Sequence, residues 1–216
     1  MRRLARVSCL VLALAACTDI ISPPRVDVYE YRLFEPDGAE LFPAAFRWPR
    51  SAMPVKISIA PGDALEPALV RAIGLWEDLF LHGEFRATLV GNAADADILV
   101  RNAVPPALLR ASRRLEGLAP ECRGATDFDP VLRDGELTLP FEIYVWSRIG
   151  PSGPNLATCY EITMLHELGH ALGIFQHSGN VGDLMFGDPV RNGFSDRDRA
   201  TAEAVYHLPV TVVPVR

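Results

Sequence analysis

The 216-residue chain has no long apolar run, no internal repeat and no cluster of lysine and arginine residues. A membrane-spanning helix needs about 20 consecutive apolar residues, whereas the mostly apolar run at residues 7–16 has ten. Acidic residues outnumber basic ones by 27 to 21, which argues against a nucleic-acid-binding protein. A hydrophobic content of 49% argues against disorder, and the length suits one domain with a good core.

Cysteine is scarce, and two of the four cysteines lie near the N-terminus. Residues 1–16 are typical of a secretory signal peptide, because three arginines precede a short apolar run. This segment ends in Leu-Ala-Ala before Cys17, which resembles a bacterial lipoprotein box. The resemblance implies cleavage before Cys17, lipidation of its thiol, and a protein anchored in the bacterial cell envelope on its periplasmic or extracellular face. A plain signal peptide with a nearby cysteine is the alternative. Loss of three arginines and no acid would change the formal charge from −6 to −9.

The other pair of cysteines, Cys122 and Cys159, would remain in the folded body, because Cys9 would leave with the signal peptide. An even number of cysteines in an oxidising compartment predicts a disulfide. Closing a loop of this size would stabilise the fold by roughly 4 kcal/mol. Two free buried thiols are the alternative.

Prolines and glycines divide the chain into segments. They are frequent between residues 18 and 50, which predicts a tether with little regular structure. We therefore expect a signal peptide at 1–16, a lipidated N-terminus and flexible tether at 17–46, one folded domain at 47–208, and a C-terminal tail at 209–216.

Alternating and helical apolar patterns predict the elements of that domain. Trp76 lies on the apolar stripe of the first helix and is expected in the core. Pro140 falls inside a predicted strand and suggests an edge strand or a bulge. Capping boxes are expected at Asp63–Glu66 and Ser195–Asp198. The predicted elements are strands at 55–59, 85–90, 95–100 and 137–146, helices at 65–80, 157–172 and 195–206, loops at 120–136 and 147–158, and a short helix or surface insertion at 105–117.

The most informative stretch is residues 159–187. His166 and His170 are four residues apart, which places both imidazoles on one face of a helix, one turn apart. Glu167 lies about 100° around the helix from His166, near a shared ion but not on it. This is the H-E-x-x-H pattern, in which two histidines bind zinc and the glutamate acts as general base.

Catalytic zinc usually has three protein ligands, so a third is needed. Gly173 can end the helix and turn the chain, which would bring His177 back toward the ion. Gln176 is the alternative third ligand, although an amide oxygen suits harder ions than zinc. Met185 follows His177 by eight residues.

These residues together resemble the metzincin metallopeptidases, and most closely the matrixins, whose pattern is H-E-x-x-H-x-x-G-x-x-H followed by a Met-turn. The sequence departs once, since Gln176 stands where the family has its third histidine and His177 follows it. The resemblance covers residues 47–208, although only 166–185 is diagnostic. Residues 18–50 hold no cysteine and so lack the cysteine-switch pro-segment that keeps many matrixins latent.

The resemblance implies an α+β fold with a twisted, mostly parallel sheet, an edge strand over the cleft, an active-site helix and a C-terminal helix. It implies a monomeric zinc endopeptidase that cleaves a protein or peptide substrate, with Glu167 as general base and Met185 as an apolar floor under the histidines. A non-catalytic zinc-binding envelope lipoprotein with the same fold is the alternative. Acidic residues could also hold structural calcium, although solvated loop carboxylates are the simpler interpretation. These acidic residues are Asp127, Asp129, Asp134 and Glu136.

Overall fold

The computed structural model describes residues 26–37, 40–106, 122–131, 135–147 and 155–216. The expected signal peptide, the lipidation site Cys17, the segment 105–117 from residue 107 onward, and Asp134 lie outside the described residues. No helix in the described part of the chain has the length and apolar character that a membrane span requires.

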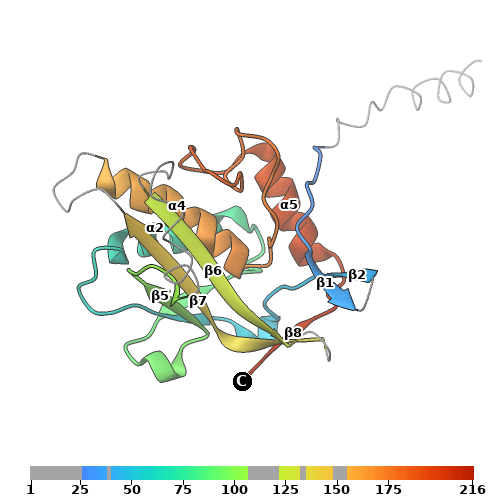
Figure 1. Cartoon of the computed structure of the whole chain (residues 1–216), viewed down its shortest axis with the longest axis horizontal. Coiled ribbons are helices and arrows are strands. Elements are labelled where there is room, and N and C mark those ends of the chain that lie inside the picture. The colour runs from blue at the N-terminus through green and yellow to red at the C-terminus, as the bar shows by residue number, and fades with distance from the viewer. Residues whose placement is uncertain (1–25, 38–39, 107–121, 132–134, 148–154) are drawn as a thin grey trace, which may run out of the picture.

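A six-stranded, mostly parallel sheet forms the centre of the fold (Figure 1). The strand order is β4-β3-β5-β7-β6, and β8 also pairs with β7. Strand β6 is antiparallel to β7, and the other pairs are parallel. With its helices the domain is mixed α and β, as the α+β expectation requires. The strands are β3 (Val55–Ser58), β4 (Ala87–Leu89), β5 (Ile98–Arg101), β6 (Cys122–Val131), β7 (Glu136–Ser147) and β8 (Val213–Val215).

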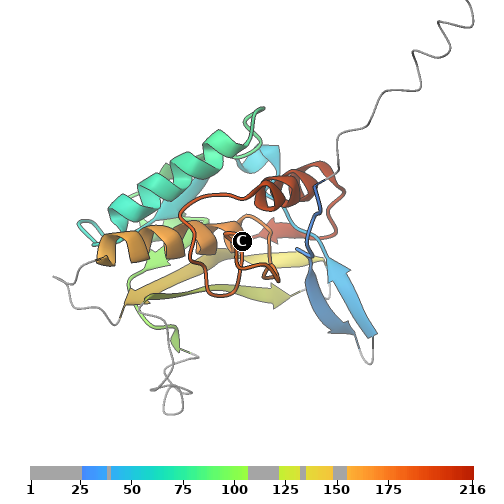
Figure 2. The ribbon, with the colours of Figure 1, turned by 90° about the horizontal axis from the view of Figure 1, so that it is seen from above.

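Helix α4 lies between helix α2 and the strands β6 and β7 (Figure 2). The indole N–H groups of Trp76 and Trp48 donate to the carbonyls of Leu165 (3.0 Å) and Ala171 (2.9 Å), which fixes α4 at its middle and at its end. Both indoles are buried, so the expected core role of Trp76 is confirmed. The helices are α2 (Glu66–Leu79), α4 (Leu156–Ala171) and α5 (Asp196–His207), with short 3-10 turns η1 (Arg50–Ala52) and η2 (Ala93–Asp95).

The two expected capping boxes have different outcomes. The box at Ser195–Asp198 is confirmed, because each side chain accepts from the other residue's backbone N–H. The box at Asp63–Glu66 is wrong, because α2 begins at Glu66 with Leu65 as its N-cap. Asp63 instead accepts from the Leu65 N–H at 2.9 Å, so its side chain closes the turn before the helix.

Strand β6 is the main difference from the sequence expectation, which placed a loop at 120–136. The stretch is polar and contains glycine and proline, yet β7 pairs with it along nearly its whole length. An edge strand tolerates such a composition because its pairing comes from its neighbour. The register shifts between Asp127 and Asp129, opposite Pro140, so the expected bulge is confirmed. Strand β7 itself lies inside the sheet, so the edge-strand alternative for Pro140 is wrong.

The ends of the described chain are also more ordered than expected. Strands β1 (Leu33–Asp37) and β2 (Glu40–Ala44) form an antiparallel hairpin within the expected tether (Figure 1). Proline is compatible with this hairpin, because each of its strands has a free edge. Residues 213–215 of the expected tail form β8 beside β7. The expectation of little regular structure is therefore wrong for 33–37 and 40–44, and the C-terminal tail adds a strand to the sheet.

The predicted disulfide is present. Cys122, the first residue of β6, is bonded to Cys159 in the first turn of α4, with the Cα atoms 5.7 Å apart. The bond therefore joins the edge strand to the helix that carries the H-E-x-x-H pattern.

Candidate active site

Helix α4 brings two imidazoles together, as the four-residue spacing predicts. The Nε2 atoms of His166 and His170 are 3.0 Å apart, and both side chains are buried. His177 approaches from the chain beyond the helix, with its Nε2 3.2 Å from that of His170. The candidate ligand atoms of the three histidines lie within 4.8 Å of one another. Three ring nitrogens therefore converge on one point.

The other ring nitrogens fix the orientation of two of these imidazoles. Nδ1 of His166 lies 2.8 Å from the Leu184 carbonyl, and Nδ1 of His170 lies 2.6 Å from the Ile174 carbonyl. A carbonyl only accepts, so each Nδ1 carries the proton and each neutral ring presents an Nε2 lone pair. Two lone pairs facing each other at 3.0 Å repel unless a cation lies between them. The three histidines are therefore a group that could hold a metal ion.

The turn after α4 explains how His177 reaches the other two rings. Gly173 has φ 109°, a conformation that glycine adopts at low cost, and its N–H donates to the His170 carbonyl. A Cβ at this position would collide with the Phe46 carbonyl. Gln176 points elsewhere, because its amide donates to the Arg32 carbonyl at 3.1 Å. Of the two candidates for third ligand, the structure places His177 in the group and Gln176 outside it.

Met185 packs against α4 at Gly169. It is fully buried, and its sulfur packs against the backbone of Gly169, which lies between the two histidines on α4. Its carbonyl accepts from the N–H of Ser178 at 2.7 Å. Because Ser178 directly follows His177, this bond ties the Met185 turn to the loop of the third histidine.

Burial keeps the histidines neutral. It lowers the pKa of His166 to about 4, and the pKa of His170 falls well below its usual value for the same reason. The pKa of the half-buried His177 is lowered by burial as well. Neutral imidazole is the form that binds a metal ion, so the trio is ready for one at neutral pH.

Glu167 lies beside the trio and is also buried. Burial raises the pKa of its carboxyl to about 8, although a hydrogen bond from Thr126 works in the opposite direction. The Thr126 hydroxyl lies 2.8 Å from Oε2 of Glu167 and 3.0 Å from its backbone carbonyl. Gly124 faces the same carboxyl, and a Cβ there would overlap it. Strand β6 therefore both makes room for Glu167 and orients it.

A cleft of about 370 Å³ opens onto these groups. Strand β6 lines one part of it, and the segment 187–189, just after Met185, lines another. His166, Glu167 and His177 all line this cleft. The remaining lining residues are Arg123, Gly124 and Thr163.

Within the described ranges, the three histidines are the one group of three or more histidine, cysteine or acidic side chains that could hold a metal ion. Tetrahedral zinc at 2.0–2.1 Å from each nitrogen needs ligand atoms about 3.3 Å apart, and the Nε2 separations of 3.0 and 3.2 Å fit this. These contacts are compatible with zinc and do not by themselves identify the ion. Of the acidic residues considered for calcium, Asp127 and Glu136 belong to no such group among the described side chains, and the side chains of Asp129 and Asp134 lie outside them.

Sequence reasoning missed several residues that hold the site together. Thr126 and Gly124 lay in a stretch expected to be a loop, and the predicted disulfide at Cys122 was the one signal that brought this stretch to the helix of Glu167. Asp198 was expected only as a helix cap, whereas its carboxylate also accepts from the Leu184 and Met185 N–H groups. Its position as the third residue of α5, where a capping box has its acidic residue, was the only sequence signal for Asp198.

A scan against models of known protein families finds no match to this chain, and a search of curated proteins finds none either. The function of the site is therefore inferred from its own geometry and chemistry.

Proposed function

We propose that the chain is a zinc-dependent endopeptidase of the metzincin type, similar to the matrixins, and that His166, His170 and His177 hold the zinc. The observation that carries this proposal is the convergence of three oriented Nε2 atoms beside a buried carboxyl group at the floor of an open cleft. A purely structural zinc site has four protein ligands and no use for such a carboxyl group.

A zinc ion bound there would supply Lewis acidity, which polarises a carbonyl and lowers the pKa of a bound water toward about 7. Glu167 accepts the proton of the attacking water and returns it to the leaving amine. Its raised pKa suits a group that takes and gives up a proton near neutral pH, and a nearby cation would lower that pKa. Thr126 holds the carboxyl in place for both transfers.

The substrate in this proposal is a protein or peptide in an extended conformation. Strand β6 pairs with β7 along one edge, and within the described residues no strand covers its other edge. The backbone of β6 lines the cleft at Arg123 and Gly124. An extended peptide can pair with this edge as an added strand, which holds its scissile bond over the histidines. Gly173 and Met185 support the site as the turn after the helix and the packing beneath it.

The cellular context is part of the same proposal. Cleavage before Cys17 and lipidation of its thiol would place a monomeric enzyme on the bacterial cell envelope. The disulfide between Cys122 and Cys159 is consistent with an oxidising compartment.

The proposal is tested with casein as substrate for the purified mature protein. Wild type should hydrolyse casein, lose activity to a chelator and regain it with zinc. Glu167→Ala should keep its zinc and lose at least 100-fold in kcat, because a general base contributes about 10²–10⁴-fold. Glu161→Ala, on the same helix and paired with Arg71 at 3.2 Å, is the matched control and should retain activity. Undiminished turnover by Glu167→Ala would overturn the assigned role, and zinc binding without turnover by wild type would favour the non-catalytic lipoprotein.

A further inference from the structure

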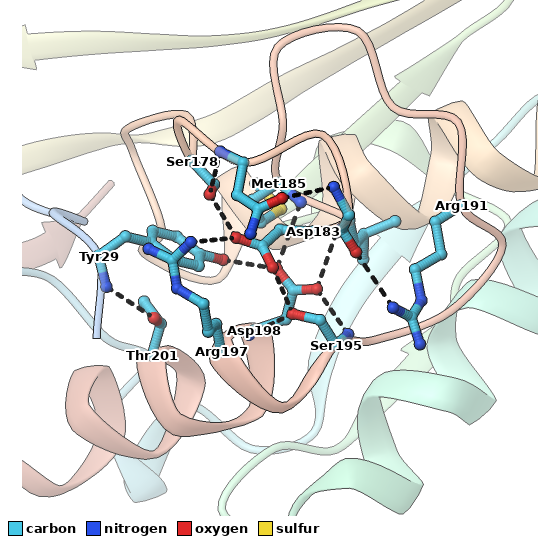
Figure 3. Close-up of polar contacts among 12 residues, drawn as sticks. Tyr29, Ser178, Asp183, Met185, Arg191, Ser195, Arg197, Asp198 and Thr201 are labelled. Atoms are coloured by element: carbon cyan, nitrogen blue, oxygen red, sulfur yellow. Dashed lines mark hydrogen bonds and ion pairs between the residues drawn. The ribbon is translucent and has the colours of Figure 1, made fainter. Parts of the chain in front are cut away.

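A buried carboxylate, Asp198, lies near the start of α5, between Tyr29 and the Met185 turn (Figure 3). Its Oδ2 accepts from the backbone N–H groups of Leu184 (2.8 Å) and Ser195 (2.7 Å). Its Oδ1 accepts from the Met185 N–H (3.3 Å) and from the Tyr29 hydroxyl (2.8 Å). Among the donors in the described residues, Tyr29 alone comes from the N-terminal part of the chain; the others belong to the Met185 turn and the start of α5.

One peptide group connects this carboxylate to a metal ligand. The peptide between Leu184 and Met185 donates its N–H to Asp198 and accepts from Nδ1 of His166 through its carbonyl. A carboxylate at the N–H end of a peptide polarises it and makes its carbonyl a stronger acceptor. A stronger acceptor on Nδ1 raises the basicity of Nε2 and fixes the ring orientation. The chain of contacts therefore runs from Tyr29 through Asp198 to His166.

The same N-terminal segment also holds the loop of the third histidine. The Tyr31 carbonyl accepts from the Phe175 N–H at 2.8 Å, and the Arg32 carbonyl accepts from the Gln176 amide at 3.1 Å. His177 is the next residue in the chain. Residues 29–32 thus support two of the three histidines. Tyr29 acts on the His166 side, and Tyr31 and Arg32 hold the residues that precede His177.

Tyr29 is also fixed along its own length. Its N–H donates to the Thr201 hydroxyl at 3.3 Å, and the Arg197 guanidinium lies 5.6 Å from its ring centroid (Figure 3). The Tyr29 side chain is buried, so water cannot readily replace its hydroxyl on Asp198. Arg197 is itself bound to the neighbouring carboxylate Asp183 at 3.0 Å, which also accepts from the Ser195 hydroxyl at 2.7 Å.

We propose that residues 29–32 act as a clamp on the metal site and that Tyr29 is a positioning residue, which orients His166 through Asp198 and the 184–185 peptide. This inference rests on the metal site of the proposed function. It adds to that site a segment, residues 29–32, that lies before the domain boundary expected at residue 47. Tyr29 does not touch the ion or the substrate. Its role is to hold the Oδ1 atom of Asp198 where the Met185 N–H can reach it.

The test is the zinc affinity of Tyr29→Phe, which keeps the ring and removes the hydroxyl. Loss of a group that hydrogen-bonds to a metal ligand costs about 10–100-fold in metal affinity. Tyr29 does not bond to His166 itself but acts on it through Asp198 and the 184–185 peptide. We therefore expect a smaller loss of zinc affinity, about five- to tenfold. The Co²⁺-substituted variant should also show a shifted visible absorption spectrum, because the orientation of His166 changes. Affinity is measured by competition with a chelating dye, at a temperature where the variant is fully folded.

Tyr206→Phe is the matched control. Tyr206 is also a buried tyrosine, within α5 itself, and its hydroxyl has no hydrogen-bond partner within the described residues. This variant should bind zinc within twofold of wild type. A lowered melting temperature in Tyr29→Phe with unchanged zinc affinity and an unchanged Co²⁺ spectrum would overturn the positioning role.

The outcomes for the clamp and for the proposed function can be told apart. If wild type hydrolyses casein and Tyr29→Phe binds zinc like wild type, the clamp is wrong and the peptidase stands. If wild type binds zinc without hydrolysing any peptide, and Tyr29→Phe binds it more weakly, the clamp stands and the peptidase is wrong.

Discussion

At the scale of single residues, the structure distinguishes His177 from Gln176 by direction. The Nε2 of His177 faces the other two histidines, whereas the Gln176 amide is bound to the N-terminal segment. His177→Ala should weaken zinc binding by at least about 100-fold, since even outer partners of a ligand cost 10–100-fold. Gln176→Ala should weaken zinc binding less, because it removes only the hydrogen bond between the loop of His177 and the Arg32 carbonyl. Equal losses in a side-by-side metal titration would contradict this assignment.

The buried titratable groups of the site predict how the stability of the metal-free protein depends on pH. His166 has a folded pKa of about 4 against 6.5 in the unfolded chain, and burial lowers the pKa of His170 as well. Between pH 4.5 and 6.5 the unfolded chain therefore binds more protons than the folded one, and stability rises with pH. Glu167 acts in the opposite sense, because its pKa is raised from 4.5 to about 8. Below pH 6.5 the two histidines change the free energy of unfolding with pH more than Glu167 does. Above pH 6.5 only Glu167 changes it.

We therefore expect the free energy of unfolding of the metal-free protein to be largest near pH 6.5 and to fall on both sides. The slope per proton is about 1.4 kcal/mol per pH unit. Urea denaturation at pH 5 to 8 measures it. Glu167→Gln should remove the decline above pH 6.5 and keep the one below. A wild-type stability that rises steadily to pH 8 would show that burial does not raise this pKa.

At the scale of elements, the disulfide predicted from the sequence connects β6 and α4, the two elements that meet at Glu167. Strand β6 orients Glu167, and α4 carries Glu167 and two histidines. The bridge closes a loop with a sequence separation of 37, so its loss should cost roughly 4 kcal/mol. For a chain of this size that is about 10 °C in melting temperature. The double variant Cys122→Ser/Cys159→Ser tests this by calorimetry, and an unchanged melting temperature would contradict it.

The elements that could be predicted are those whose signal is local. The apolar stripe of α2, the Ser195 cap of α5 and the alternation in β3 each follow from neighbours in the sequence. Strand β6 could not be predicted in this way, because its polar sequence pairs only through contact with β7. The β1–β2 hairpin was missed for the same reason, since its prolines indicated a tether.

The candidate site divides along the same line. The histidines and Glu167 were predictable because one helical turn and one glycine determine their spacing. Their supports were not, because Thr126 and Tyr29 reach the site from segments 41 and 169 positions from their partners. Hydrogen bonds over such separations leave no pattern in a single sequence.

At the scale of the whole molecule, Tyr29 is held against α5 by hydrogen bonds to Asp198 and Thr201, and it follows Cys17 by only twelve positions. A fully extended chain spans at most about 3.5 Å per residue, so a lipid on Cys17 would hold the domain within roughly 40 Å of the membrane surface. On the proposed function, substrates would then be proteins close to that surface.

Lipidation itself is tested by Cys17→Ser. The variant should move from the membrane fraction to the soluble fraction, because the acyl chains that anchor the protein would be missing. Cys9→Ser, the same substitution within the expected signal peptide, is the control and should leave retention unchanged. Continued membrane retention of Cys17→Ser would count against the anchor.

The most direct measurement is anomalous X-ray diffraction, at the zinc absorption edge, from crystals of the zinc-replete mature protein. We predict one peak about 2.0–2.1 Å from the Nε2 atoms of His166, His170 and His177, with the Glu167 carboxyl group close by but not bound to it. A peak at any other group of side chains would contradict the account. So would a peak bound by His166, His170 and Gln176 but not by His177.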